Sequence, residues 1–233
     1  MDIIQAIRER KSIRGFKPDP VPAKVLEELL DVCRWAPSFQ NTQSWTLYVL
    51  GGKVMEELKA RLTEKVKAKV PVTSDLPTPE LTDCYLQRSI AERDSVDTHQ
   101  FPPGTPDLDA KRAEFWIKGG RWHNAPNGIV ICTERALFPK AIFDMGTMTM
   151  TIALAAPAFG LGTCIMSRAV YYPEILRELV GIPQSKVIIT GISIGYPDPK
   201  AIINTHPRNR VPLDAFAHWF GFKEKKGKRA EEI

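Results

Sequence analysis

The stretch from Met145 to Ser167 constrains the fold most, because it contains no charged residue. A helix that is apolar all round is buried in protein or in lipid, and this stretch is long enough for a membrane helix. Its threonines, Pro157 and the Gly160–Gly162 turn dilute its hydrophobicity. We therefore predict a buried core helix over Lys140–Phe159, followed by a short strand over Gly162–Met166, and no membrane span.

The rest of the chain alternates between helical and strand patterns. Apolar residues at helical spacing predict helices, and β-rich runs predict strands. Residues 71–109 are rich in proline and polar residues, with one plausible helix near Glu80–Arg93, which indicates a variable insertion or lid. The sequence predicts one α/β or α+β domain over 1–220, with a charged tail at 221–233. The other predicted helices start at Asp2, Pro22 and about Lys53, end near His123, and span Glu174–Val180; the other strands are Trp45–Leu50, Gly128–Thr133 and Lys186–Ile194.

Composition excludes several classes of protein. Over 233 residues the chain is 43% hydrophobic and 25% charged, which is typical of a soluble globular domain. The net charge of +5 is modest and partly lies in the C-terminal tail, so we predict no nucleic-acid partner. Four dispersed cysteines without a CxxC pair favour neither a metal site nor a disulfide framework. With no secretory signal visible, the expected location is the cytoplasm.

No self-contained catalytic set stands out. The histidines lack an HExxH or GxSxG context, and we interpret each as a surface or hydrogen-bonded residue rather than a ligand or a base. The Gly160-Leu161-Gly162 triplet follows a helix and lacks the third glycine of a dinucleotide fingerprint, so it is interpreted as a turn. We therefore assign no catalytic side chain. The four histidines are His99, His123, His206 and His218.

Four segments, weak singly, together resemble the FMN-dependent nitroreductase family from near the first residue to about Trp219. Their order and spacing along the chain both fit that family. Chance agreement of four such segments in order is improbable. The segments are Arg10–Phe16 (RKSIRGF), Ala36–Trp45 (APSFQNTQSW), Gly160–Ser167 (GLGTCIMS), and Ile194–Pro197 (IGYP) followed by Pro207–Leu213 (PRNRVPL).

The resemblance implies an α+β fold, in which helices wrap a central, mainly antiparallel sheet, and a domain-exchanged homodimer. It also implies a ping-pong oxidoreductase, in which NADPH or NADH reduces FMN and a nitroaromatic, a quinone or a related small electrophile is then reduced. The family also contains ene-type reductases and reductive dehalogenases, and these remain alternatives. A flavin-binding protein without turnover is the rival from another class, and a basic RNA-associated protein is a distant third.

Arginines would hold the phosphate of FMN, because forked guanidinium groups match its charge and its acceptor oxygens. Arg10, Arg208 and Arg210 are the candidates by their place in the matching segments. Ser12 would bond the phosphate or the ribityl chain. By the family pattern Arg14 would lie near the pyrimidine edge of the flavin, where a cation stabilises reduced flavin. Lys11 either contacts the ribityl chain through its backbone or is a surface lysine.

The resemblance assigns Pro37, Ser38, Phe39 and Asn41 to the cofactor bound mainly by the other subunit, with Phe39 stacked over substrate. The alternative interpretation is a helix stop and a turn, in which Asn41 and Gln43 only bond the loop backbone.

By the same pattern Ile165 and Met166 would pack on the flavin ring, and the backbone N–H of Ser167 would point at flavin N5. The chain departs from the family where Ser44 replaces the usual proline, and where Ser167-Arg168 replaces the more frequent glycine or acidic residue. These departures bear on the subfamily. The insertion is expected to shape the acceptor pocket.

Overall fold

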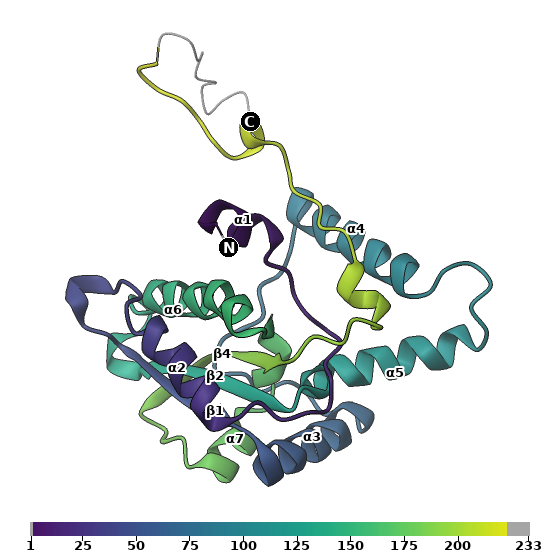
Figure 1. The fold of residues 1–233 in the computed structure, drawn as a ribbon, viewed down its shortest axis with the longest axis horizontal. Coiled ribbons are helices and arrows are strands. Elements are labelled where there is room, and N and C mark those ends of the chain that lie inside the picture. Colours follow the sequence, from purple (N-terminus) through teal and green to yellow (C-terminus); the bar gives the residue numbers. More distant parts are fainter. Residues whose placement is uncertain (1, 223–233) are drawn as a thin grey trace.

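The centre of the molecule is a four-stranded sheet in the order β1-β2-β4-β3, with every neighbouring pair antiparallel. The structure is a computed structural model, and it describes residues 2–222. Helices lie around the sheet (Figure 1). This arrangement confirms the predicted α+β fold with a mainly antiparallel sheet. The strands are β1 (Trp45–Leu50), β2 (Asn127–Glu134), β3 (Gly162–Met166) and β4 (Lys186–Gly195).

The sheet carries a hydrophobic cluster on each face, because side chains alternate along a strand. Ile129 and Ile131 of β2 pack in one cluster with the second and sixth helices, while Val130 and Cys132 pack in the other with the third and seventh. Ile131 pairs with Thr190 and Cys132 pairs with Ile188, so β4 has a bulge between these partners. The bulge changes the alternation of side chains between the two faces of the sheet at this point. The α-helices of residues 2–222 are α1 (Ile3–Glu9), α2 (Ala23–Cys33), α3 (Gly52–Lys67), α4 (Asp83–Gln100), α5 (Leu108–Gly120), α6 (Ile142–Ala155) and α7 (Pro173–Val180).

The predicted strands β1 and β3 have the predicted bounds, and β2 and β4 extend by one or two residues beyond theirs. Three predictions about helix ends were wrong. The core helix expected over Lys140–Phe159 is α-helical over Ile142–Ala155 and continues as a 3-10 turn to Phe159. The helix expected near Glu80–Arg93 reaches Gln100, and the helix expected to end near His123 ends at Gly120. The chain leaves α5 because Trp122, His123 and Asn124 all have positive φ, which breaks the helix.

Helices α1 and α6 leave apolar faces exposed on the single chain. Met145 and Ile152 of α6 are buried against the sheet, as expected for a core helix, yet Phe143 is 77% exposed. The prediction of a buried helix therefore holds for one face only. By length and composition, Ile142–Phe159 is the one helical segment within residues 2–222 that could cross a membrane. The exposed apolar residues of the two helices are Ile3, Ile4, Ile7, Ile142, Phe143 and Met150.

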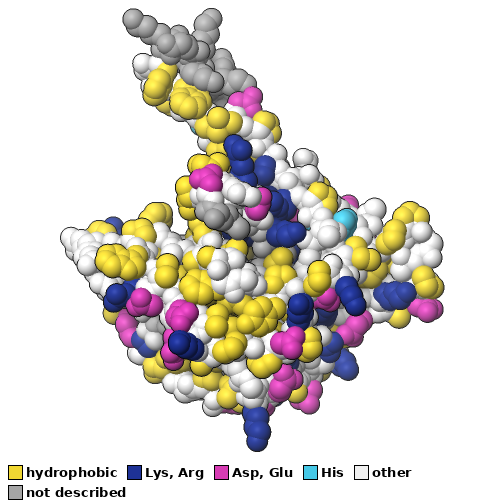
Figure 2. Space-filling model, viewed as in Figure 1, with side chains coloured by type: hydrophobic (Ala, Val, Ile, Leu, Met, Phe, Trp, Pro, Cys, Tyr) yellow, Lys and Arg dark blue, Asp and Glu magenta, His cyan; other side chains and the backbone are white. Residues whose placement is uncertain are grey.

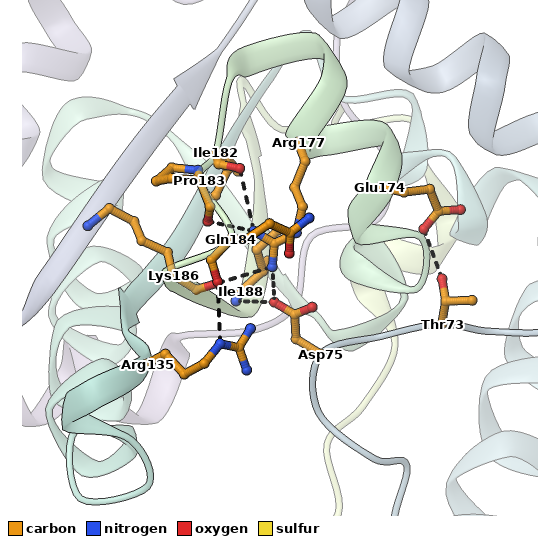
Figure 3. Close-up of polar contacts among 10 residues, drawn as sticks. All are labelled: Thr73, Asp75, Arg135, Glu174, Arg177, Ile182, Pro183, Gln184, Lys186 and Ile188. Carbon is orange, nitrogen blue, oxygen red and sulfur yellow. Dashed lines mark hydrogen bonds and ion pairs between the residues drawn. The ribbon is translucent and has the colours of Figure 1, made fainter.

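The insertion begins with a segment that is tied to the body of the protein. The carboxylate of Asp75 accepts hydrogen bonds from Arg177 Nη2 of α7 at 2.5 Å and from the backbone N–H of Ile188 in β4 at 2.8 Å. Thr73 Oγ1 donates to Glu174 of α7 at 2.8 Å. Figure 3 shows these groups meeting beside α7 and the start of β4. Residues 70–76, which we call the root of the insertion, are thus fixed to the core, and only the later part of the insertion projects from it.

The C-terminal part of the described chain extends away from the body of the molecule (Figure 1). It contains a short 3-10 turn, Leu213–Ala215, and ends its described part at residue 222. Nearly all of the predicted charged tail, 221–233, lies outside the described residues.

Candidate active site

The first family-like segment, Arg10–Phe16, lies beside the start of β3 and the turn after β4. Ile13 N–H donates to Thr163 O and Lys17 N–H donates to Tyr196 O, both at 2.9 Å. Isolated bridges join Ser12 to Thr163 and Phe16 to Pro197. Segments far apart in the sequence therefore meet at one edge of the sheet.

Asn204 fixes the backbone at Arg14 and Gly15. Its Oδ1 accepts hydrogen bonds from the N–H groups of Arg14 (2.9 Å) and Gly15 (3.1 Å), and its Nδ2 donates to Gly15 O at 2.8 Å. A Cβ on Gly15 would lie 2.2 Å from Ala201 Cβ, so only glycine fits this approach. Asn204 has no signal in the sequence that separates it from any other loop asparagine. The sequence therefore pointed to Arg14 but not to the residue that positions it.

A small cavity of about 90 Å³ lies at this junction and is lined mainly by cations. Burial lowers the pKa of Arg10, and the like charges of Arg208 and Arg210 lower it further. Arg208 also donates from its guanidinium to the backbone oxygens of Arg10 and of Arg8, the latter at 2.6 Å. Such a convergence of positive charge favours a bound anion. The lining residues are Arg10, Lys11, Ser12, Arg14, Glu92, Ile203, Asn204, His206, Arg208 and Arg210, so every predicted phosphate or ribityl residue is present.

A larger cavity of about 290 Å³ adjoins the first, since Arg14 and Glu92 line both. The predicted ring-contacting residues Ile165, Met166 and Ser167 form its sheet-side wall. The opposite walls come from α4 and from α5. Only the α4 wall belongs to the insertion that was expected to shape the pocket. The sequence interpretation missed the α5 residues, because nothing in a single helix indicates which face meets a cavity. The remaining lining residues are Arg93, Val96, Asp97, Phe115, Trp116, Gly119, His123, Cys164 and Arg168.

His123 corrects the prediction that the histidines are surface or hydrogen-bonded residues. It is 8% exposed in the wall of the larger cavity, and within residues 2–222 its buried Nδ1 has no hydrogen-bond partner. Burial lowers the pKa of its imidazole to about 3, and the nearby cations Arg14, Lys118 and Arg168 add to the effect. The ring is therefore neutral. His206 is also buried, but it is hydrogen-bonded to Ser95 at 3.0 Å.

The residues assigned to the other subunit's cofactor lie elsewhere on this chain. Pro37, Ser38 and Phe39 line a separate hollow together with Lys140, Phe143 and Asp144. Asn41 is exposed, and Gln43 Nε2 donates to its backbone oxygen at 3.3 Å.

The loop around these residues is held by the first turn of α6. The buried carboxylate of Asp144 accepts hydrogen bonds from Phe39 N–H at 3.0 Å and from Ser44 Oγ at 2.8 Å. Ser44 therefore has a local role in this chain, where the family usually has proline.

Fold and cavities together define a class of protein: an α+β protein in which a small cavity with several cationic side chains adjoins a larger, mostly apolar pocket beside an edge strand. A family model described as the nitroreductase family matches residues 7–196. The chain belongs to the nitroreductase family, and the predicted resemblance is confirmed.

Named relatives match over almost the whole chain. A 4-nitrobenzoate reductase from Pseudomonas putida is 29% identical, covering 95% of this chain and 96% of its own length. A chloronitrobenzene nitroreductase from Comamonas testosteroni is 28% identical, covering 90% and 93%. Among solved structures, the FMN-dependent nitroreductase NfnB from Mycobacterium smegmatis, in complex with NADPH, is 25% identical with a TM-score of 0.82, covering 94% of this chain and 100% of the other.

Proposed function

We propose that this protein is an FMN-dependent oxidoreductase that uses NADPH or NADH to reduce nitroaromatics, quinones or related small electrophilic acceptors. The observation that carries the proposal is the pair of adjoining cavities, one cationic and one mostly apolar, which Arg14 connects. The names of the relatives support it, and so does the similarity to an FMN-dependent nitroreductase whose structure contains NADPH.

The smaller cavity fits the phosphate end of FMN. Arg10, Arg208 and Arg210 repel one another there, and a bound dianion would relieve this repulsion. Ser12 adds a hydroxyl donor, and Lys11 adds a further cation to the lining. Glu92 is the one carboxylate in this lining, and its Oε1 lies 4.0 Å from His206 Nδ1. The donor set therefore suits a phosphate rather than a metal ion.

The larger cavity fits the flavin ring and an acceptor. Ile165 and Met166 would contact the ring, Ser167 would offer its N–H at N5, and Arg14 would lie at the pyrimidine edge. When bound, FMN supplies the chemistry by accepting a hydride from NAD(P)H and passing electrons to the acceptor in a ping-pong cycle. The chain itself orients the two partners, limits access of water and places a cation near the ring. We assign no catalytic side chain to this step.

We further propose a homodimer in which Pro37, Ser38, Phe39 and Asn41 reach the partner's cofactor. The apolar faces of α1 and α6 need a cover in water, since large exposed apolar patches mark association surfaces. In Figure 2 hydrophobic side chains are visible across the middle of the body and along the projecting C-terminal segment. That segment carries further exposed aromatic residues, namely Phe216, Phe220 and Phe222.

The remaining sequence-based assignments stay as parts of this proposal. They are one domain over 1–220 with an insertion at 71–109, and a charged tail at 221–233. They also include a cytoplasmic location with no nucleic-acid partner and no membrane span. All four cysteines are free, which suits a reducing compartment.

The first test is the visible spectrum of the purified protein under anaerobic conditions. We expect a flavin spectrum that bleaches with NADPH or NADH and returns on adding a nitroaromatic or a quinone. A protein that binds flavin without this cycle would be the non-catalytic alternative. A colourless protein that takes up no FMN would contradict the proposal.

The second test addresses the phosphate site. Arg208→Ala should weaken FMN binding about 10- to 100-fold, because a hydrogen bond to a charged group contributes about 1.5–3 kcal/mol. Arg61→Ala is the matched control, since Arg61 pairs with Glu178 on the α3 surface and lies outside both cavities. Flavin release is measured by fluorescence on dilution. Equal retention in the two variants would remove Arg208 from the site.

The dimer is tested separately by light scattering after gel filtration. Phe143→Glu places a charge on the exposed face of α6 and should shift the protein toward a monomer. A wild-type protein that is monomeric at micromolar concentration would contradict this part of the proposal.

A further inference from the structure

Arg168 is a cation in the larger cavity without an acidic partner. Its guanidinium carbon lies 4.2 Å from the centroid of the Trp116 ring, and it also interacts with the side chain of Tyr171. No Asp or Glu within residues 2–222 forms an ion pair with it. Burial lowers its pKa, although an arginine remains charged. A partly buried guanidinium of this kind lacks the anion that it would normally bind.

Three elements bring this guanidinium to the cavity wall. Arg168 follows β3 in a 3-10 turn, Ser167–Val170, while Trp116 and Gly119 lie on α5. A Cβ on Gly119 would lie 3.1 Å from Arg168 Nη1 and 3.7 Å from His123 Cε1. Arg168 and His123 therefore approach the same point, and the absence of a side chain at Gly119 leaves room for them.

The charges in the cavity favour an anionic ligand on this side. Both acidic lining residues, Glu92 and Asp97, are on α4. Asp97 already accepts hydrogen bonds from Arg112 Nε at 2.9 and 3.1 Å. Arg168 on the opposite side has an aromatic ring beneath it, and a guanidinium donates in its own plane, so stacking leaves its N–H groups able to bind a carboxylate.

We propose that Arg168, stacked on Trp116 and flanked by His123, binds a carboxylate on the aromatic acceptor, so that the enzyme selects anionic acceptors over neutral ones. His123 contributes a neutral imidazole with a buried, unpartnered Nδ1. Trp116 is half exposed and offers an aromatic surface next to the cation. This inference rests on the proposed function, since it specifies the acceptor class of the same site.

The test compares two probes of similar shape that differ in charge, 4-nitrobenzoate and 4-nitrobenzamide. Each is titrated calorimetrically into the oxidised holoprotein, and each is then mixed with the reduced holoprotein in an anaerobic stopped-flow experiment. The variants are Arg168→Gln, which removes the charge, and Arg168→Lys, which keeps the charge but loses the fork. Arg88→Gln is the control, because Arg88 also lies over an aromatic ring, that of Tyr85, but outside the cavity lining.

Arg168→Gln should weaken binding of 4-nitrobenzoate about 10- to 100-fold, as expected for the loss of a charge-assisted contact. Binding of 4-nitrobenzamide should change less than about threefold. Arg168→Lys should fall between wild type and Arg168→Gln, and Arg88→Gln should match wild type. Flavin content and reduction by the nicotinamide should stay constant across the set.

Several results would overturn the proposal. They are an equal loss for both probes, a wild-type protein that does not prefer the carboxylate, and loss of flavin in Arg168→Gln. If Arg168→Gln slows reduction of the flavin by NADPH but not by NADH, Arg168 binds an anionic group of the nicotinamide donor and not of the acceptor. If the wild-type flavin fails to bleach while binding still discriminates by charge, the proposed function fails and the carboxylate site stands.

Discussion

The root of the insertion and the helix after it are attached in opposite ways. The root, residues 70–76, is fixed by an ion pair between Asp75 and Arg177 whose side chains are 12% and 9% exposed (Figure 3). Helix α4 has no buried residue, and its ion pair, Asp97–Arg112, has side chains that are 32% and 42% exposed. The same insertion therefore contains a part of the core and a part that only covers the cavity.

This difference indicates that one part of the insertion contributes to the stability of the fold and another part to selection of the acceptor. A buried polar group that loses its partner is costly, whereas an exposed ion pair contributes little. Changes in α4 can then alter which acceptor enters without unfolding the protein. Changes in the root or in the sheet-side wall should affect the whole fold.

The largest expected effect is at the root. Asp75→Ala leaves Arg177 and the N–H of Ile188 without their acceptor, and should lower the free energy of unfolding by about 3–5 kcal/mol. The matched change in α4, Asp97→Ala, should cost about 1 kcal/mol or less. Urea unfolding at equal protein concentration measures both. Similar losses in the two variants would show that α4 is as integral to the fold as the root.

The next effect compares the packing of the sheet behind the larger cavity, where Gly191 pairs with the lining residue Met166, with the exposed surface of α4. A Cβ on Gly191 in β4 would lie 2.5 Å from Ala169 Cβ and 2.8 Å from the Trp122 ring, so Gly191→Ala should destabilise the protein by about 1–3 kcal/mol. Ala91→Ser also adds one heavy atom, but on the exposed surface of α4, and should change stability by less than about 0.5 kcal/mol. Thermal melting distinguishes the two. A neutral Gly191→Ala would mean that this part of the sheet has more freedom than the packing indicates.

Much of the sheet-side wall was predictable from the sequence, and little of the α4 wall was. Strand β3 has the predicted bounds, because a short apolar run after a glycine turn is a local signal. The arginines of the small cavity were found through two motifs and lie together as predicted. Whether they hold FMN remains a proposal.

The features that the sequence could not predict depend on contacts between distant segments. Asn204 positions Arg14 from 190 residues away, and no pattern near it indicates this. Helix α4 has no apolar stripe, so its C-terminal end could not be located from periodicity. The cavity face of α5, with Trp116 and Gly119, is defined only when the helix packs beside His123 and the turn that follows β3.

A third prediction concerns pH and the buried His123 in the cavity wall. In the unfolded chain its imidazole takes up a proton near pH 6.5, but in the folded protein only near pH 3. The unfolded state therefore binds more protons between these values, and the stability present above pH 6.5 is lost as the pH falls toward 3. Between pH 7.5 and pH 5.5, the free energy of unfolding of wild type should fall by about 1.4 kcal/mol more than that of His123→Gln.

Urea unfolding of the two proteins at pH 7.5 and at pH 5.5 measures this difference. Parallel losses in wild type and variant would mean that His123 takes up its proton near pH 6.5 in the folded protein as well. It would then be a cation in the cavity wall and not a neutral group.

The smallest effect on stability should come from Val96, the apolar residue of α4 that lines the larger cavity. Val96→Ala should change the free energy of unfolding by about 0.5 kcal/mol or less, since the side chain is only half buried. The same substitution in β2, Val130→Ala, removes fully buried methyl groups and should cost more than about 1 kcal/mol. Val96→Ala should instead change the KM for the acceptor, while flavin content and reduction by the nicotinamide stay unchanged. If Val96→Ala destabilised the protein as much as Val130→Ala, α4 would belong to the core, and its role as a separate, adjustable wall would have to be abandoned.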